Sequence, residues 1–425
     1  MAKKKSKPEK GSYREVIGEI DLLDFAREHY SRYGRSVLED RAFPDFRDGM
    51  NPVNRRTLWS AYSLGIRSNS KFVKSARIVG DVLGRYHPHS DQAAYGAMVK
   101  MTNVNGVVSN IPIGLFEGEG NWGSLSNSAA AAMRYTEARL SKFSEFLFNK
   151  FYMLVVRMIP NFDSSTVEPL ILPALLPLVL LNGRFGIAPG ATTNIPKLEP
   201  DGVFDVLRAA FKGEELTPKF LAKTLRLTST FGGAEDESKE NMRSESRREI
   251  FTSVRGSTNI VSPYEYDEKK RTMVFDGFAV DSIPPVIAKL IEIKAVQTAR
   301  DISDVKDRFG RLEVQFKRLD EDQIDTAIGK VLKILSSREN VVLNFTVRTV
   351  NDLEQSDASM RPMTLIEVFT KWVKWRLALE VKACKYWVKE DDKEIRRIEL
   401  LKQAVLMLDF IVSLLKNKKL TQTDV

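Results

Sequence analysis

The chain of 425 residues contains one cysteine, Cys384, and three histidines. A single thiol excludes an internal disulfide and any metal site built from several cysteines, and it is typical of a protein from a reducing compartment. Two of the histidines form the segment His87–Pro88–His89. No cysteine lies near them and the third histidine is distant in sequence, so we predict no zinc site.

The sequence also lacks the phosphate-binding pattern Gly-x-x-x-x-Gly-Lys-Ser/Thr, and no serine or cysteine has a recognisable triad context. We therefore expect no nucleotide hydrolysis by this chain. The acidic run LDEDQID at 319–325 lacks the strand and loop context of a magnesium site. A solvated face is the interpretation that we prefer for it.

No hydrophobic run is long enough to cross a membrane. The most apolar stretch, residues 170–181, is short for a span and contains Pro173 and Pro177, so it predicts a buried strand or turn. The opening MAKKKSKPEK is cationic without an apolar core behind it, which predicts a flexible tail and not a secretory signal. We expect a cytoplasmic protein without a membrane segment.

Positive charge is what the chain has in excess, with 65 Lys and Arg against 56 Asp and Glu and a net charge of +9. This balance suits a polyanionic partner such as nucleic acid, although many proteins without such a partner are equally basic. The densest group of cations lies between residues 41 and 142 and comprises Arg41, Arg47, Arg55, Arg56, Lys71, Lys74, Arg77, Arg85, Arg134, Arg139 and Lys142. Most surface charges only solvate a protein, but cations clustered near helix starts favour phosphate contacts.

These cations fall on a predicted helix-turn-helix pattern. Capping and stop signals predict helices from Pro52 to the stop at Gly65, over 71–84, and from Ser90 or Asp91 to about Met101. The glycine-rich segment 114–124 predicts a loop or wing. Thr136 can cap a further helix whose apolar face would include Leu140, Phe143, Phe146 and Leu147.

The second half of the chain predicts an α+β domain followed by a helical arm. Strands are expected over 258–266, 271–280 and 340–350, a helix near 284–299, and a charged, weakly ordered loop over 232–249. From Met363 onward there is neither glycine nor proline, which predicts one helix of about 50 residues or a hairpin broken at 389–397. Such an arm is better suited to dimer contact than to catalysis.

Tyr135 lies between Arg134 and Thr136 and allows two interpretations. It can be an ordinary packing residue. It can also be a nucleophile: a free phenol, with a pKa of about 10, reacts poorly at neutral pH, but an adjacent arginine stabilises both the phenolate and a phosphoryl group in transit. The residues by themselves leave both open.

Five segments, in one order along the chain, resemble the DNA-cleaving subunit of type IIA DNA topoisomerases, the group of gyrase A, topoisomerase IV A and phage medium subunits. They are RAFPDFRDGMNPVNRR (41–56), SARIVGDVLGRYHPHSD (75–91), EGEGNWGS (117–124), AAAMRYTEARLS (130–141) and LLNGRFGIAPGATTNIP (180–196). Beyond residue 200 the likeness lies mainly in the order of elements.

The resemblance implies an α+β multidomain fold. Its parts would be a flexible basic tail and N-terminal helix (1–34), a winged-helix DNA-cleavage domain (35–155), an α+β tower domain (156–355) and coiled-coil or dimer-gate helices (356–425). It also implies that Tyr135 attacks a DNA phosphodiester and forms a 5′-phosphotyrosine link, with Arg134 stabilising the transition state and Arg41 and His87 near the scissile phosphate. The DNA-binding residues would be Arg47, Arg55, Arg56, Lys74, Arg85 and His89, with Ile187 as a wedge between bases. The alternative for Ile187 is ordinary strand burial.

Two departures remove part of the usual phosphate-binding set: Asn51 replaces a lysine and Asn54 replaces a frequent histidine. Mg²⁺ and ATP would be bound mainly by a partner subunit, with this chain acting on double-stranded DNA as a homodimer within a heterotetramer. The chain ends before a DNA-wrapping domain, which suits relaxation or decatenation without supercoiling, and a phage subunit. The alternative is a non-enzymatic helix-turn-helix DNA-binding protein.

Overall fold

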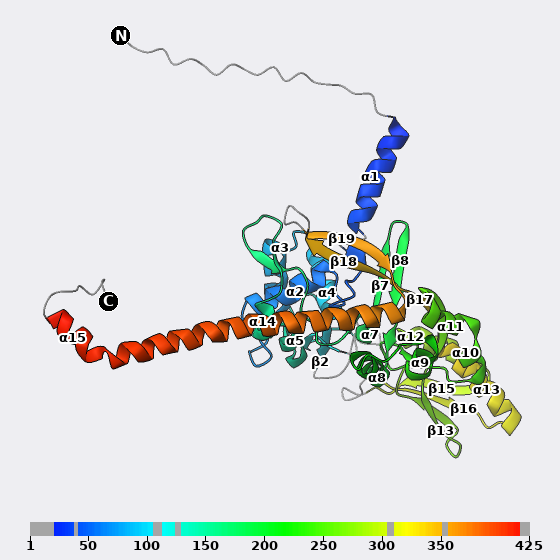
Figure 1. Ribbon diagram of the computed structural model, residues 1–425. Coiled ribbons are helices and arrows are strands. Elements are labelled where there is room, and N and C mark those ends of the chain that lie inside the picture. Colours follow the sequence, from blue (N-terminus) through cyan, green and yellow to red (C-terminus); the bar gives the residue numbers. More distant parts are fainter. Residues whose placement is uncertain are drawn as a thin grey trace, which may run out of the picture.

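The computed structural model describes residues 21–37, 41–104, 113–123, 129–303, 310–350 and 356–416. A compact body carries two projections: helix α1 (Leu22–Val37) stands off it, and the long helix α14 (Leu365–Leu406) extends well beyond it (Figure 1). Within the described ranges, no helix is both long and apolar enough to span a membrane. The mixture of helices and sheets confirms the predicted α+β character.

Three helices form the predicted unit near the N-terminus: α2 (Pro52–Ser63), α3 (Ser75–Arg85) and α4 (Asp91–Lys100). Each packs against the other two. Proline at the first position starts α2, and Gly65 terminates it with a φ of +76°, a conformation that favours glycine. The predicted helix over 71–84 begins later, at Ser75, because residues 73–74 pair in a sheet instead.

That sheet has four strands in the order β1-β4-β3-β2: β1 (Val73–Lys74), β4 (Glu137–Leu140), β3 (Phe116–Glu119) and β2 (Thr102–Val104). Strand β3 lies in the glycine-rich segment expected as a loop or wing. The prediction that Thr136 caps a helix is wrong: Thr136 is buried and leads into β4, and the next helix, α5 (Lys142–Leu147), is capped by Ser141. Antiparallel pairing with β3 outweighed the local helical pattern.

Short elements connect this unit to the next sheet: α6 (Lys150–Met153), β5 (Met158–Pro160), β6 (Val167–Pro169) and α7 (Leu178–Asn182). The apolar stretch 170–181 is buried as predicted, apart from partly exposed positions at 175–176. Its end, however, forms helix α7, so the prediction of a strand or turn is wrong there. Four consecutive buried residues suit a short helix enclosed on all sides as well as a buried strand.

A seven-stranded sheet follows, in the order β7-β8-β17-β12-β11-β10-β9. Its strands are β7 (Arg184–Ala188), β8 (Ala191–Ile195), β17 (Ser336–Val342), β12 (Arg255–Val261), β11 (Ala234–Glu235), β10 (Leu227–Thr228) and β9 (Lys197–Leu198). The helices nearby are α8 (Pro200–Phe211), α9 (Pro218–Thr224), α10 (Lys239–Arg243) and α11 (Glu245–Thr252).

The prediction of a weakly ordered loop over 232–249 is wrong. The segment contains β11, α10 and most of α11, and a buried ion pair joins Arg247 Nε to Glu235 Oε1 at 2.7 Å. Thr258 from β12 also contacts the Glu235 carboxylate. The many charges of the segment look like a solvated loop in the sequence, but pairing two of them inside the fold orders it.

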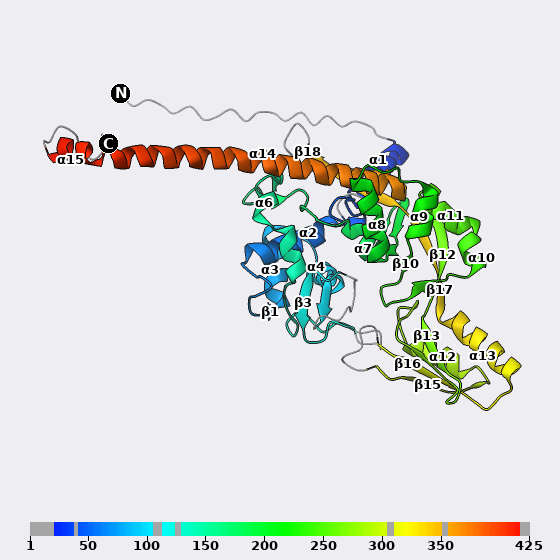
Figure 2. The same ribbon diagram turned by 60° about the horizontal axis from the view of Figure 1, so that its bottom comes forward.

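A smaller lobe lies at one end of the body (Figure 2). Its sheet has the order β13-β14-β16-β15, with strands β13 (Tyr264–Asp267), β14 (Thr272–Phe275), β16 (Leu312–Phe316) and β15 (Val296–Asp301), and helices α12 (Pro284–Ile291) and α13 (Glu321–Ile334) share its core. The β13–β14 hairpin pairs residues from two segments predicted as strands, 258–266 and 271–280. The helix expected over 284–299 stops at Ile291, because residues from Val296 pair in the sheet.

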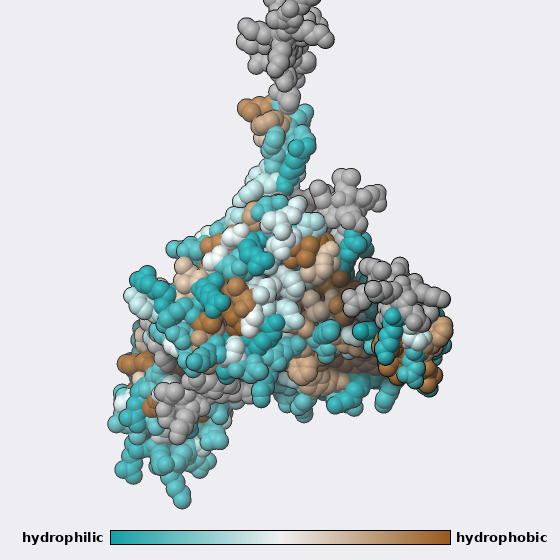
Figure 3. Space-filling view, turned by 90° about the vertical axis from the view of Figure 1, so that its left-hand side faces the viewer, coloured by the Kyte–Doolittle hydropathy of each residue, from teal (hydrophilic) through white to brown (hydrophobic). Residues whose placement is uncertain are grey.

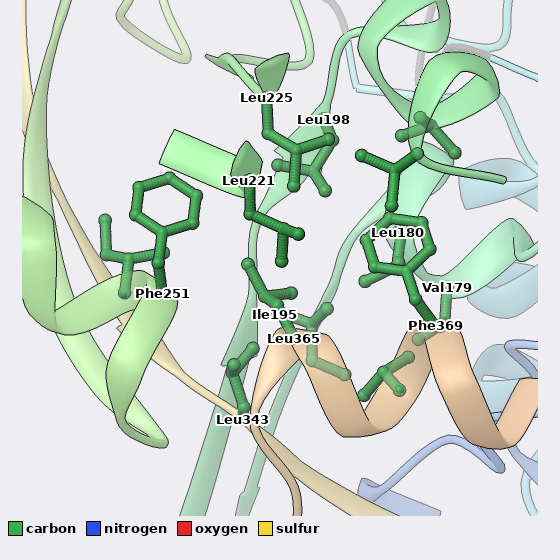
Figure 4. Close-up of a cluster of buried hydrophobic side chains, with 14 of the residues drawn as sticks. Val179, Leu180, Ile195, Leu198, Leu221, Leu225, Phe251, Leu343, Leu365 and Phe369 are labelled. Carbon is green, nitrogen blue, oxygen red and sulfur yellow. The ribbon is translucent and has the colours of Figure 1, made fainter. Parts of the chain in front are cut away.

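The hairpin β18 (Asn344–Val350) with β19 (Ser356–Pro362) leads into α14, and α15 (Leu408–Lys416) follows it. Helix α14 is continuous over 42 residues, so the charged cluster 389–397 does not break it into a hairpin. Its first turns are fixed by a capping box of Thr364 and Glu367. They also bury Leu365 and Phe369 in the main core, beside Val179, Leu180 and Ile195 (Figure 4).

Candidate functional site

Tyr135 lies on a turn just before β4, and its side chain is 63% exposed. The guanidinium carbon of the adjacent Arg134 is 4.7 Å from the centre of its ring. Arg134 is exposed as well. A phenol that faces solvent beside a cation is accessible to a macromolecular substrate, whereas a packing tyrosine would be covered.

The turn that carries Tyr135 is held from behind by the buried hydroxyl of Thr136. Thr136 Oγ1 lies 2.8 Å from Ser75 Oγ and 2.8 Å from the hydroxyl of Tyr95. The Tyr95 hydroxyl also donates to the Ala131 carbonyl oxygen at 2.6 Å, and the Ser75 amide donates to the Thr136 carbonyl oxygen at 3.0 Å. Ser75 begins α3 and Tyr95 lies in α4, so these two helices fix the position of Tyr135.

Ser75 and Tyr95 were not predicted from the sequence as parts of the site. Both lie next to or within the family segments, but they are 61 and 41 residues from Thr136. The sequence carries no signal for them, because the partner of each hydroxyl is set only when the helices pack. These residues position the turn and do not themselves face solvent with Tyr135.

A second group of side chains gathers around His87. Arg56 donates to both oxygens of Glu168, at 2.8 Å for the closest pair of atoms, and its Nη1 lies 2.9 Å from His87 Nδ1. His87 is buried. Burial, together with the charges of Arg56, His89 and Arg41, lowers the pKa of His87 to about 4.

His87 is therefore neutral at pH 7. Arginine is a donor only, so Nδ1 accepts the bond from Arg56, and the ring proton is assigned to Nε2. A neutral histidine of this tautomer can donate one hydrogen bond to a phosphate oxygen. Its donor persists across the whole range from about pH 5 to 8, in which an ordinary histidine changes charge.

We expect His87→Gln to change how stability depends on acid. The folded pKa lies below the unfolded value of 6.5, so the unfolded chain binds more protons in this range and the stability contribution is lost as the pH falls from about 6.5 towards 4. Over this pH range the free energy of unfolding, measured with denaturant, should fall more steeply for the wild type than for the variant, by up to about 1.4 kcal/mol per pH unit. Gln92→Ala, an exposed change without a titrating group, should keep the wild-type slope, and parallel slopes for all three proteins would contradict the assignment.

Arg41 is exposed, and its carbonyl oxygen accepts a hydrogen bond from Asn51 Nδ2 at 2.7 Å. The other end of the same amide, Asn51 Oδ1, accepts from Arg184 Nη2 at 2.9 Å. Burial lowers the pKa of Arg184 to about 10. Asn51, at the position where the family has a lysine, thus connects two arginines that are far apart in sequence.

Two predicted DNA-binding arginines are directed into the protein. Arg55 is buried, and its guanidinium donates to Asp48 at 2.7 and 3.0 Å and to the Met50 carbonyl oxygen at 3.0 Å. Arg47 forms a two-point pair with Asp45 at 2.8 and 2.7 Å. A direct DNA contact by Arg55 would require its buried ion pair to open, which favours a structural role for this residue.

Arg56 is partly buried on Glu168 and His87, whereas Lys74, Arg85 and His89 are accessible. Lys74 is paired with Glu137 at 2.7 Å and Arg85 with Asp81 at 3.5 Å, both with side chains about half exposed. His89 is exposed and stacks on His87, with ring centres 4.3 Å apart. Exposed ion pairs of this kind contribute little to stability and can exchange partners for phosphates.

Ile187 is 64% exposed on the β7–β8 hairpin, so its alternative interpretation, ordinary strand burial, is wrong. Among the described residues, no hydrogen bond or ion pair joins Arg134 or Tyr135 to Arg41, Arg56 or His87. The chain therefore presents the tyrosine and the histidine cluster as two separate groups. In the part of the chain that the structure describes, no group of three or more His, Cys, Asp or Glu could hold a metal ion.

An exposed phenol beside a guanidinium, on a three-helix unit with further accessible cations, defines a protein suited to the phosphodiester backbone. The chain belongs to the family of the A subunits of DNA gyrase and topoisomerase IV, whose model matches residues 41–424. This confirms the resemblance of the five segments.

Named relatives agree with the family. The chain is 30% identical to the A subunit of DNA topoisomerase 4 from Staphylococcus epidermidis over 415 residues, which are 95% of this chain and 49% of that protein. It is 31% identical to the A subunit of DNA gyrase from Kosmotoga olearia over 402 residues, 92% of this chain and 47% of that protein. The chain thus spans about half the length of the curated relatives that it matches.

Proposed function

We propose that this chain is the DNA-breaking and rejoining subunit of an ATP-dependent type IIA DNA topoisomerase. The phenol oxygen of Tyr135 attacks a backbone phosphorus, the bond from phosphorus to the 3′ oxygen breaks, and a 5′-phosphotyrosine link forms. The phenol gives up its proton and the departing 3′ oxygen gains one. One phosphoester replaces another, so rejoining is the reverse reaction and needs no further energy source.

The observation that carries this proposal is the exposure of Tyr135 beside Arg134 on a turn fixed by Thr136. A nucleophile must be reachable by a rigid duplex and must not move away from the attacking position. Arg134 would stabilise the charge that develops on the phosphate in the transition state. Arg41 and His87 would donate to the phosphate oxygens, His87 through its Nε2 proton.

The fold supports a path for DNA across the body. The three-helix unit with its four-stranded sheet would act as the winged-helix domain of 35–155, with Lys74, Arg85 and His89 on the backbone. The two sheets beyond it would act as the tower domain of 156–355. Ile187, exposed on its hairpin, would enter between bases and bend the duplex.

The remaining requirements would be met by a partner subunit. The sequence has no recognisable phosphate-binding motif for ATP, so the energy of ATP hydrolysis would be supplied by the partner. Mg²⁺, bound mainly by the partner, would stabilise charge on the scissile phosphate. The functional assembly would be a heterotetramer that relaxes or decatenates double-stranded DNA, with this chain present as a homodimer.

The far end of the arm supports the dimer. Figure 3 looks onto the tip of the arm, where hydrophobic side chains are exposed. The exposed fraction is between 52% and 78% for each of the following residues: Ile395, Ile398, Leu400, Leu401, Val405, Leu406, Met407, Leu408 and Phe410. An apolar patch of this extent on a projecting helix would be covered by a second copy of the chain. Such a contact agrees with the prediction of coiled-coil or dimer-gate helices at 356–425.

We expect the double change Leu401→Glu and Val405→Glu to dissociate this dimer. The two positions are one helical turn apart and 55% and 68% exposed in the single chain, so the change removes two buried apolar contacts and places two charges in the contact. Burial of two such side chains contributes about 3–6 kcal/mol, so the dissociation constant of the double variant should be more than about a hundredfold higher. Analytical sedimentation would measure this dissociation constant. Gln403→Glu is the charge control, and a double variant that stays as dimeric as this control would refute the interface.

Covalent trapping separates the proposal from its rival, a DNA-binding protein without catalysis. The chain, a candidate ATPase partner, Mg²⁺ and plasmid are incubated and then stopped with detergent. Protein linked to 5′ ends is the result that the proposal predicts. DNA binding without linked protein under any condition would favour the binding protein.

A further inference from the structure

The hairpin that carries Ile187 exposes a second large apolar side chain. Phe185 is 66% exposed and Ile187 64%, whereas Gly186 and Ala188 between and beside them are buried. Side chains alternate along a strand, so Phe185 and Ile187 share the outward face of β7. The hairpin is at one edge of the seven-stranded sheet and extends beyond the neighbouring strand β17 (Figure 1).

The inward face fixes this orientation. Ala188 is buried with Ala42 and Phe43, and a Cβ atom added to Gly186 would collide with the carbonyl oxygen of Ala42. A shift of one residue would move Phe185 inward, but it would place a large ring where only glycine fits. The strand therefore holds both apolar side chains outward.

Nothing in the described part of the chain accounts for the exposure of Phe185. Its cross-strand neighbour is Asn194, whose amide donates to Glu339 Oε1 at 2.9 Å, and the neighbour of Ile187 is Thr192. Both neighbours are polar, so neither forms an apolar cover. Two large apolar side chains exposed side by side form a surface that a bound ligand would remove from water.

The surroundings point to DNA as that ligand. Arg184 directly precedes Phe185 and therefore lies on the inward face of β7, where its guanidinium donates to the amide oxygen of Asn51. Arg41 lies at the other end of that amide and is exposed. The exposed Arg41 precedes Ala42, which packs on Gly186 between Phe185 and Ile187. An exposed aromatic ring near an exposed cation suits a polyanion that carries stacked bases.

The spacing also fits. Two residues along a strand advance about 6.6 Å. Two base-pair steps of duplex DNA advance about 6.8 Å. We propose that Phe185 is a second DNA-deforming residue, which contacts a base step two steps from the one opened by Ile187. The inference rests on the proposed function, and it adds a residue that would select for easily unstacked steps, such as pyrimidine–purine, at both places.

The test uses the whole chain with its candidate ATPase partner and Mg²⁺, and a duplex of about 30 base pairs with dyes at its ends and 2-aminopurine at candidate steps. Bending brings the dyes together, and unstacking raises the 2-aminopurine emission. We expect Phe185→Ala to bind roughly tenfold more weakly and to lose the emission at one step, while Ile187→Ala loses it at the step two positions away. Phe211→Ala, which removes a 46% exposed phenylalanine from the end of α8, should behave as the wild type.

The outcomes distinguish the two levels of inference. If Phe185→Ala matches Phe211→Ala in affinity, bending and emission while Ile187→Ala is impaired, Phe185 has no such role and only this inference fails. A change in oligomeric state caused by Phe185→Ala would also overturn it, because a second protein copy would then be the cover. If the wild type neither bends the duplex nor forms covalent complexes, the proposed function itself fails.

Discussion

Replacing Tyr135 with phenylalanine is expected to abolish covalent protein–DNA complexes and leave DNA binding intact. The change removes the nucleophilic oxygen but keeps the ring beside Arg134, which is 4.7 Å from the ring centre. The turn is held by Thr136 and not by the phenol, so its shape is preserved. Loss of a nucleophile reduces turnover by about 10³- to 10⁶-fold. Detergent-stopped plasmid cleavage with labelled ends measures the complexes.

Two variants complete this test. Tyr264→Phe removes one hydroxyl from a partly exposed tyrosine of β13 and should cleave like the wild type. Arg134→Gln should slow formation of the complex by about 10²- to 10³-fold without preventing it, as is usual when one transition-state donor is lost. If Tyr135→Phe still yields DNA linked to protein, another residue is the nucleophile.

The largest expected effect on stability comes from Asp48→Ala. Asp48 is fully buried, and its carboxylate accepts from Arg55 at 2.7 and 3.0 Å, from the Met50 amide at 3.1 Å and from the Leu172 amide at 3.0 Å. Removing it leaves the Arg55 charge buried without its partner. Breaking a buried pair in this way costs about 3–5 kcal/mol. Denaturant unfolding, followed by the shift of the midpoint, measures the loss.

The control is Asp205→Ala, which breaks the exposed pair of Asp205 with Arg208 on α8 and should cost less than about 1 kcal/mol. The double change Asp48→Ala and Arg55→Met removes the orphaned charge and should recover part of the loss. Equal costs for the two single changes would contradict the structural role of Arg55. In that case Arg55 would again be a candidate for direct contact with DNA, as the sequence predicted.

The sequence alone determined the features that depend on near neighbours. Pro52 and Gly65 set the position of α2, because a proline at the helix start and a chain reversal at its end are decided within a few residues. The absence of glycine and proline after Met363 determined a long helix. The five family segments identified the family and drew attention to Tyr135, whose role remains a prediction.

Only the tertiary structure decided which charged groups and hydroxyls are buried, and which groups they pair with. Arg56 meets Glu168 across 112 residues, and Arg184 meets Asn51 across 133. The order of 232–249 depends on the pair of Glu235 with Arg247 inside the fold.

Arg55 and Arg56 are neighbours in sequence, yet one is buried on Asp48 and the other reaches His87. Their difference, like the neutral state of His87 and the outward face of Phe185, follows from packing between distant segments. Local pattern carries no information about such packing, because desolvation and charge pairing depend on whatever the fold brings within a few ångströms.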